Sequence, residues 1–423
     1  MSHRQILLVA YQCGPAMGSV SQIGWEWYSR LNLENKVTLV THVRNRPALE
    51  AAGAPLPGSE ILFVDTEWFA GPLYRLAKRI FPRSEHSVFL LSSLDYFVFD
   101  WSAFRALREK LLAGARWQVL HRVTPVTLAA ATWLGRLGLP TVIGPLNSGL
   151  DDPKGFGKIM RRESTWLVRL REFGRIFDHL IGSSRRAARI LTASKATLRG
   201  VPKGYRNRCM PMIENGVDLT KFSATPWPEQ PDRGNALKVL FVGRLIPVKA
   251  LNLLLDAMTK LVVSGSNVEL TVVGEGPLRA EWEAYAAQAG LAAAVRFVGN
   301  LPLEAVARHM QDCHVFCLPS VRESGGAVLL EAMACARPVI AMNFGGPAEL
   351  VDPEVGALID LTTPEQASVE LAKTLADVIT HPQVWRQRGQ AGRQRVELLH
   401  SWQAKVACAS TLYTELLTEG TAL

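Results

Sequence analysis

Two cations follow an apolar stretch at residues 238–242, where a strand would end and a helix begin. Gly243 and Arg244 come directly after the stretch, and Lys249 opens the helical pattern that follows. Positive side chains at a helix N-terminus do not complement the helix dipole, so we expect an anion to lie between them. A diphosphate fits this pair best. The alternative is a surface Arg and Lys that happen to flank a turn.

A second candidate loop follows the apolar stretch 314–318. Gly325 and Gly326 lie in this loop, and we expect a helix to begin there and to continue through Ala327 and Val328. Glycines let a phosphate approach closely, and the first N–H groups of a helix have no partner within it. The sequence therefore predicts a phosphate-binding helix start.

Two glutamates flank this helix start. Glu323 lies in the loop and Glu331 lies on the helix, one to two turns in. A glutamate in the loop can reach sugar hydroxyls, and one on the helix suits ribose hydroxyls. The alternatives are an exposed loop charge for Glu323 and a buried acid that caps the helix or forms a salt bridge for Glu331.

Short apolar stretches alternate with helical patterns along the chain, which is typical of parallel α/β sheets. They form two series, at residues 6–11, 37–42, 61–64, 117–122, 141–143 and 191–193, and at residues 238–242, 268–273, 295–298, 314–318, 338–342 and 357–359. Ligands bind outside the carboxyl ends of such strands. We predict two Rossmann-like domains that face each other across a cleft lined by strand-end loops.

A segment rich in proline, FSATPWPEQPDRGN, separates the two series. We predict a first domain at residues 1–222, a linker at 223–235 and a second domain at 236–400. Helical patterns at 364–380 and 402–417 complete the chain. Residues 401–423 are expected to form a helix that crosses back to the first domain.

The C-terminal half resembles the family 4 glycosyltransferases of the GT-B architecture. The matching pieces are IENGVD at 213–218, VGRLIPVK at 242–249, VVGEGP at 272–277, VRFVGNLP at 295–302 and the Glu323 to Glu331 spacing. The segment YQCGPAMGSVSQIGWEW at 11–27 is similar to a Gly-Ser loop in a subset of the family.

The resemblance implies retaining transfer of a sugar from a nucleotide-diphosphate-sugar donor. It places Arg244 and Lys249 on the diphosphate, Glu323 at the donor sugar and Glu331 at the ribose. The first domain is then expected to bind the acceptor. The basic stretches described below suggest that this acceptor is anionic or a lipid-linked saccharide of cell-surface polysaccharide synthesis. The second domain binds the nucleotide-sugar.

Further site residues follow from the resemblance. Gly18 and Ser19 would close on the diphosphate or the acceptor, while Phe297 and Gly299 would frame the base. His121 follows a strand in a setting where the family often has a histidine, and it would contact the donor sugar or the acceptor. A histidine whose ring is satisfied by the backbone is the alternative.

Two positions depart from the family pattern. Gly325 stands where an aromatic residue is usual, and Val20 stands where the subset often has an acid. These departures affect the expected recognition of sugar hydroxyls and acceptor. The phosphate-binding elements are all present.

The sequence contains no Asp-x-Asp motif after a strand, so we expect neither a metal ion nor another cofactor. Arg244, Lys249 and backbone N–H groups would neutralise the leaving group instead. A nucleotide-sugar epimerase of GT-B shape and an inactive sugar-nucleotide-binding subunit are the alternatives.

The net charge of the 423 residues is +9, and it is concentrated. Residues Lys154–Arg189 contain ten Lys or Arg against three acids, and a second basic stretch at 75–83 includes apolar side chains. Such segments could lie on an anionic membrane surface, contact an anionic acceptor, or form solvated helix faces. No nucleic-acid motif accompanies the charge, so we expect no nucleic-acid partner. No apolar stretch is long enough to span a bilayer, and we expect a cytoplasmic protein, peripheral on the inner face of the membrane if bound to it.

Overall fold

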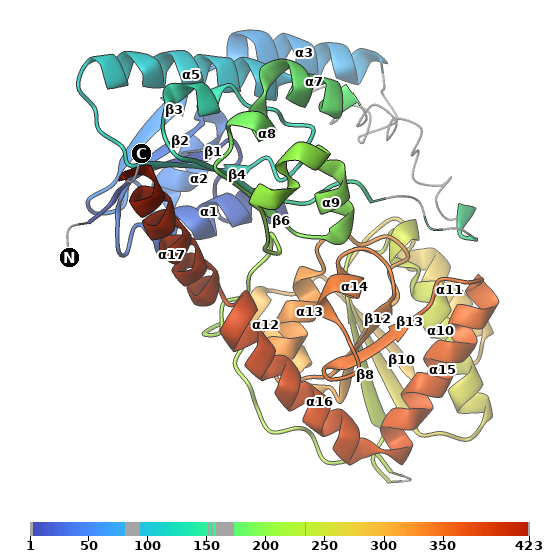
Figure 1. Cartoon of the computed structure of the whole chain (residues 1–423). Coiled ribbons are helices and arrows are strands. Elements are labelled where there is room, and N and C mark those ends of the chain that lie inside the picture. Colours follow the sequence, from blue (N-terminus) through green and yellow to red (C-terminus); the bar gives the residue numbers. More distant parts are fainter. Residues whose placement is uncertain are drawn as a thin grey trace. The chain divides into compact units, whose positions relative to one another are not determined.

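A computed structural model of the chain describes residues 3–80, 94–150, 153, 155–157, 173–232 and 234–421. The chain divides into two compact units (Figure 1). Unit 1 comprises residues 1–149, 164–214 and 405–423, and unit 2 comprises residues 150–163 and 215–404. Each unit contains one parallel sheet, as the two series of apolar stretches predicted.

Unit 1 is built on a seven-stranded sheet in the order β3-β2-β1-β4-β5-β6-β7. The central strands are almost completely buried because helices cover both faces of a parallel sheet. The strand order reverses between β1 and β4, and crevices that bind ligands form at such a switch point. The strands are β1 (Gln5–Ala10), β2 (Lys36–His42), β3 (Glu60–Val64), β4 (Val119–Thr124), β5 (Thr141–Leu146), β6 (Arg189–Thr192) and β7 (Cys209–Pro211).

The last helix of the chain belongs mostly to unit 1. Tyr413 on this helix is fully buried and contacts His121 of β4, and Thr414 accepts a hydrogen bond of 2.6 Å from the Arg4 guanidinium. These contacts attach the helix to the sheet of unit 1. The helices of this unit are α1 (Ser19–Leu31), α2 (Arg46–Ala51), α3 (Glu67–Ile80), α5 (Asp95–Leu112), α7 (Phe173–Ile181), α8 (Ser183–Arg186), α9 (Lys195–Gly200) and, from Lys405 onward, α17 (Trp402–Thr421).

Unit 2 is built on a six-stranded sheet in the order β10-β9-β8-β11-β12-β13. This is the same 3-2-1-4-5-6 order as in the first six strands of unit 1, and it places the switch point between β8 and β11. The strands are β8 (Leu237–Val242), β9 (Val268–Val273), β10 (Val295–Gly299), β11 (Val315–Leu318), β12 (Val339–Met342) and β13 (Gly356–Ile359).

The helices of unit 2 follow from apolar periodicity and capping. In α10, buried leucines recur with helical spacing, and α15 packs alongside it. Helix α15 begins at Pro364, and the Thr363 hydroxyl caps it by accepting from the Gln366 N–H at 3.3 Å. The helices are α10 (Leu251–Val263), α11 (Arg279–Gln288), α12 (Leu303–Asp312), α13 (Ala327–Ala334), α14 (Pro347–Leu350), α15 (Pro364–Thr380) and α16 (Pro382–Arg395).

Residues 223–235, which the sequence predicted as a linker, are held within unit 2. The buried Arg337 guanidinium donates to the Thr225 hydroxyl at 2.7 Å and to the Pro226 carbonyl at 3.0 Å. The Trp227 indole donates to the His314 carbonyl at 2.8 Å. The chain passes from unit 1 to unit 2 earlier, between Glu214 and Asn215.

Candidate active site

The switch point of unit 2 brings together the two loops that the sequence singled out. Arg244 follows β8 and is exposed, whereas Glu323 lies in the loop after β11 and is partly buried. The Lys249 ammonium forms an ion pair with the Glu323 carboxylate, and the Val321 N–H donates to the Val248 carbonyl at 2.9 Å. A cation and a carboxylate therefore meet at the carboxyl ends of two adjacent strands.

The α13 N-terminus lies on the same loop. Helix α13 begins at Ala327, followed by Val328, and Gly326 precedes it with a φ of 66°, a conformation that favours glycine. No side chain caps this helix. Its first N–H groups have no partner within the helix, and the helix dipole favours an anion there. Gly325 is buried beside them.

A loop after β12 supports this helix start, and sequence reasoning missed it. The Gly346 N–H donates to the Glu323 carbonyl at 2.9 Å. A Cβ atom at Gly345 would lie 2.1 Å from that carbonyl, and one at Gly346 would lie 2.3 Å from the Ser324 carbonyl. The one available signal was a Gly-Gly pair after a predicted strand, at the same edge of the sheet.

The turns after β8, β9 and β10 are also packed backbone against backbone. The Gly274 N–H donates to the Gly299 carbonyl at 2.8 Å, and a Cβ atom at Gly274 would lie 2.0 Å from the Gly243 carbonyl. Gly299 has a φ of 74° and ends β10, two residues after the partly buried Phe297. The predicted base-binding residues therefore lie on the turn next but one to Arg244.

Glu331 lies on α13 and is partly buried. Within the part of the chain that the structure describes, no hydrogen bond or ion pair engages its carboxyl group, so it is not the salt-bridged acid of the alternative interpretation. Burial raises the pKa of Glu331 to about 7. A desolvated carboxyl group without a protein partner is suited to accept hydrogen bonds from ligand hydroxyl groups.

The titration of Glu331 should be visible in the stability of the protein. Its pKa rises from 4.5 in the unfolded chain to about 7 in the folded one. Between these values the folded state holds a proton that the unfolded state has lost, so the free energy of unfolding falls as the pH rises. Glu331→Gln removes this loss. Relative to wild type, the variant should gain stability from pH 4.5 to about 7, by up to about 3 kcal/mol.

Chemical denaturation of both proteins across this pH range measures the difference. Glu269→Gln, at an exposed position on β9, is the matched control and should follow wild type. Parallel pH profiles for wild type and Glu331→Gln would contradict the prediction.

His121 is not placed as the sequence predicted. It lies in the middle of β4 and is fully buried, with Nδ1 2.6 Å from the Tyr413 hydroxyl and Nε2 2.7 Å from the Gly144 carbonyl. Burial lowers the pKa of His121 to about 4, so the ring is neutral. Nε2 must donate to the carbonyl, and Nδ1 then accepts from the hydroxyl. Both nitrogens are occupied within unit 1, which corrects the expectation that His121 faces a ligand.

Gly18 and Ser19 form the exposed N-terminus of α1. Gly18 has a φ of 107°, and no side chain caps the helix. A Cβ atom at Gly24 would lie 2.3 Å from the Gln12 carbonyl, so α1 packs closely on the loop that follows β1. The arrangement leaves N–H groups free to bind an anion, and the role of Gly18 and Ser19 stays a prediction.

Sequence reasoning also missed a polar cluster at the strand ends of unit 1. The buried Asp95 carboxylate accepts from the Tyr11 hydroxyl at 2.6 Å and from the Arg44 guanidinium at 2.9 Å. Arg44 also pairs with Glu67. Tyr11, Arg44 and Glu67 follow β1, β2 and β3, so their common position after predicted strands was the signal that could have found them.

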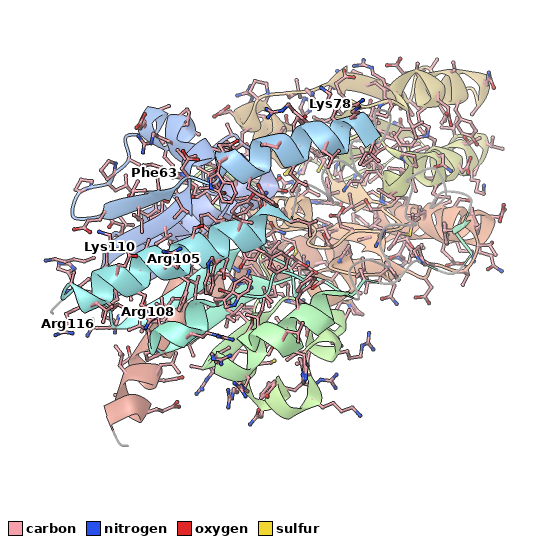
Figure 2. All side chains as sticks on the ribbon, turned by 90° about the horizontal axis from the view of Figure 1, so that it is seen from above. Phe63, Lys78, Arg105, Arg108, Lys110 and Arg116 are labelled. Atoms are coloured by element: carbon pink, nitrogen blue, oxygen red, sulfur yellow. The ribbon has the colours of Figure 1, made fainter. Side chains whose placement is uncertain are left out.

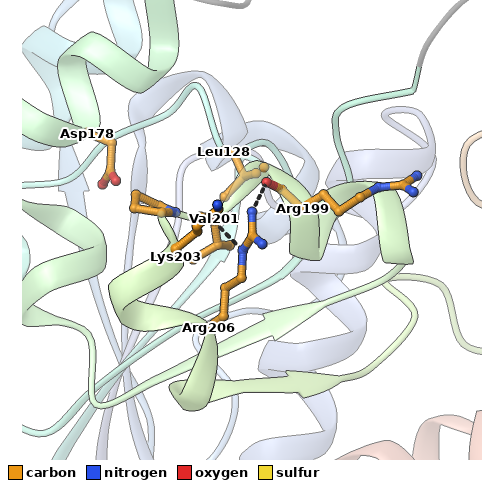
Figure 3. Close-up of a pocket in the computed structure, with 8 residues that line it drawn as sticks. Leu128, Asp178, Arg199, Val201, Lys203 and Arg206 are labelled. Carbon is orange, nitrogen blue, oxygen red and sulfur yellow. Dashed lines mark hydrogen bonds between the residues drawn. The ribbon is translucent and has the colours of Figure 1, made fainter.

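A pocket of about 270 Å³ in unit 1 contains none of the predicted site residues (Figure 3). The Arg206 guanidinium in its lining donates to the Val201 and Arg199 carbonyls at 2.9 and 2.6 Å. This side chain therefore stabilises the loop on which it lies. The pocket is lined by Leu128, Asp178, Arg199, Gly200, Val201, Pro202, Lys203 and Arg206.

Three sequence predictions concern metal ions and membranes. Among the described residues, no group of three or more His, Cys, Asp or Glu side chains is placed to hold a metal ion. Within the same residues, no helix has the length and apolar character needed to cross a bilayer. Much of the basic stretch Lys154–Arg189 lies outside the described residues, namely residues 154 and 158–172.

Comparisons with known proteins show which proteins this chain resembles. Residues 226–394 match the family described as "Glycosyl transferases group 1". The chain is 32% identical over 220 residues to the 2-deoxystreptamine glucosyltransferase of Streptomyces kanamyceticus, covering 50% of this chain and 56% of that protein. It is 33% identical over 213 residues to the phosphatidyl-myo-inositol mannosyltransferase of Mycobacterium tuberculosis, covering 49% and 54%. The chain thus spans about half the length of the curated relatives it matches.

Solved structures resemble the whole chain. Sucrose-phosphate synthase from Thermosynechococcus elongatus has a TM-score of 0.65 at 22% identity, covering 99% of this chain and 100% of that one. Anabaena HepE in complex with UDP has a TM-score of 0.63 at 18% identity, covering 97% and 100%. These likenesses confirm the predicted GT-B fold of two Rossmann-like domains.

Proposed function

We propose that this chain, whose residues 226–394 match the group 1 glycosyl transferases, is a retaining glycosyltransferase that uses a nucleotide-diphosphate-sugar donor and a hydroxyl acceptor. The main support for this proposal is the ion pair between Lys249 and Glu323 at the switch point. Glu323 lies on the loop that leads to the uncapped α13 N-terminus. Cations and free N–H groups at strand ends suit a diphosphate.

In the proposed reaction, the donor diphosphate competes with Glu323 for Lys249. Arg244, Lys249 and the amides around Gly325 and Gly326 then carry the charge that develops on the leaving group. Glu323, released from Lys249, can accept hydrogen bonds from hydroxyl groups of the donor sugar. Glu331, whose carboxyl group makes no hydrogen bond or ion pair among the described residues, would accept hydrogen bonds from the ribose.

The transfer itself breaks the bond between the sugar's anomeric carbon and the diphosphate oxygen. A bond from the acceptor hydroxyl oxygen forms on the same face of the sugar, and a donor phosphate oxygen takes the hydroxyl proton. The products are the glycoside and the nucleoside diphosphate. Because protein groups meet the leaving-group charge, we propose that no divalent ion is required, and turnover in the presence of a chelator tests this point.

The donor and acceptor classes rest on the comparisons. A structural neighbour was solved in complex with UDP, and one relative is named as a GDP-mannose-dependent mannosyltransferase, so UDP- and GDP-sugars are the first candidates. One relative is named for phosphatidyl-myo-inositol, which favours a saccharide or lipid-linked acceptor.

A panel of UDP-, GDP- and ADP-sugars tests the proposal. At least one donor should raise the thermal unfolding temperature and undergo slow hydrolysis to the nucleoside diphosphate. Incubation with donor alone also separates transfer from epimerisation, because an epimerase would convert the donor sugar without releasing the diphosphate. No stabilisation and no hydrolysis across the whole panel would reject the proposal.

A further inference from the structure

A strip of five aromatic rings reaches the surface of unit 1 beside α5. Successive ring centroids along it are 5.0 Å apart for Phe177 and Phe97, 6.4 Å for Phe97 and Trp133, 5.6 Å for Trp133 and Trp101, and 5.5 Å for Trp101 and Phe104. The side chains of Trp101 and Phe177 are 44% and 39% exposed. The rings therefore pack against one another, and the strip reaches solvent at Trp101 on α5 and at Phe177 on α7.

The outward face of α5 continues this apolar surface with positive charge. Arg105, Arg108 and Leu112 follow Trp101 by four, seven and eleven residues. This is helical spacing, so the four side chains share one face of α5. All four are exposed, Leu112 by 80%. Figure 2 shows Arg105 and Arg108 along this helix, with Lys110 near its end.

Helix α3 has the same combination. Trp68 is 70% exposed, and Arg75, Leu76 and Arg79 follow it seven, eight and eleven residues later. Leu76 is 51% exposed and Ile80, in the last turn, 53%. Helix α3 packs against α5, and both helices are seen side by side on this face in Figure 2. Two adjacent helices thus present tryptophan, large aliphatic side chains and arginine to solvent.

The part of the chain that the structure describes offers no ion-pair partner to the arginines of this face. Within the described residues, no ion pair engages Arg75, Arg79, Arg105 or Arg108. Acids of the two helices lie elsewhere: Asp95 and Asp100 are buried, and Glu67 pairs with Arg44, which leaves Glu109 as the exposed acid of α5. The surface is therefore both apolar and cationic.

We propose that this α3–α5 face docks on an anionic lipid surface. Tryptophan and large aliphatic side chains can enter the boundary between headgroups and acyl chains, while arginine stems lie along it and their guanidinium groups bind lipid phosphates. Exposed Leu76, Ile80 and Leu112 favour lipid over nucleic acid, whose phosphates would match the arginines and leave the aliphatic side chains in water. The inference does not depend on the proposed reaction, because binding is measured without turnover.

Co-sedimentation with phosphatidylcholine vesicles, with and without phosphatidylglycerol, tests this proposal on the full chain. Wild type should sediment with the anionic vesicles and be released by added salt. Arg105→Glu with Arg108→Glu should weaken binding by about 30-fold or more, since the loss of each positive charge near an anionic leaflet costs about 1 kcal/mol. Arg105→Lys with Arg108→Lys keeps the charge and should retain binding.

Trp68→Ala tests the apolar contribution without changing the charge. The Trp68 ring contacts Phe69 and is otherwise largely exposed, so its removal should leave the fold intact while weakening vesicle binding. Lys260→Glu with Arg308→Glu, both exposed on unit 2, is the matched charge control and should bind as wild type does. The proposal fails if wild type does not bind anionic vesicles, or if the unit 2 control loses as much binding as the Arg105→Glu, Arg108→Glu variant. It also fails if this face binds DNA but not lipid.

Discussion

Turnover of the donor should fall about 100- to 1000-fold when Lys249 is replaced by alanine, the loss typical of one preorganised donor aimed at a developing anion. Lys249 is partly buried, and its ammonium pairs with Glu323 at the switch point. Removing it leaves the diphosphate with Arg244 and the α13 amides alone. The measurement is the rate of nucleoside diphosphate release from whichever sugar donor the panel identifies.

The fold should survive Lys249→Ala, because the lysine lies on a surface turn rather than in the core. Unchanged circular dichroism and a similar unfolding temperature without donor would establish this. Lys260→Ala removes an exposed lysine from α10 of the same unit and should leave turnover unchanged. A fully active Lys249→Ala variant would remove the central claim about the diphosphate site.

Replacement of Gly274 by alanine should destabilise the protein strongly, lowering the free energy of unfolding by about 3–5 kcal/mol. The added Cβ atom would lie 2.0 Å from the Gly243 carbonyl, and the backbone there has a φ of 135°. The turn after β9 must therefore separate from the turn that precedes Arg244. Denaturant unfolding of the full chain measures the change.

Gly265→Ala separates the two causes of this loss. Gly265 also has a positive φ, of 80°, but nothing lies within 4 Å of the Cβ position. Its replacement should cost about 1 kcal/mol, from backbone strain alone. Equal losses for the two variants would show that the close contact with Gly243 is unimportant.

The sheets could be predicted because they depend on local patterns. Twelve of the strands were expected from apolar runs, and α15 was predicted with its observed bounds because Thr363 and Pro364 signal a helix start. Strand β7 was missed, since Cys209–Pro211 is three residues long and ends in proline. Residues 223–235 were predicted as a linker from their composition. Their contact with Arg337 could not be predicted, because Arg337 lies more than a hundred residues later in the chain.

Some features of the candidate site could likewise be predicted from local sequence motifs, and others could not. Residues 226–394 match the family described as "Glycosyl transferases group 1", in agreement with the family prediction. The structure joins Lys249 to Glu323, a contact that the sequence did not predict. The close approach of Gly346 to Glu323 could not be predicted, because it depends on how two loops meet at the sheet edge. His121 was misplaced for a similar reason: its partner Tyr413 lies nearly three hundred residues later in the chain.

The chain path has a consequence for biosynthesis. The main part of unit 2, residues 215–404, lies between segments of unit 1, whose remaining helix is translated after unit 2. On the ribosome, unit 2 can acquire its sheet while His121 still lacks Tyr413 and the Ile213 carbonyl still lacks the Lys405 ammonium. The unit translated first would therefore finish folding second, and its exposed apolar surface would depend on chaperones during that interval.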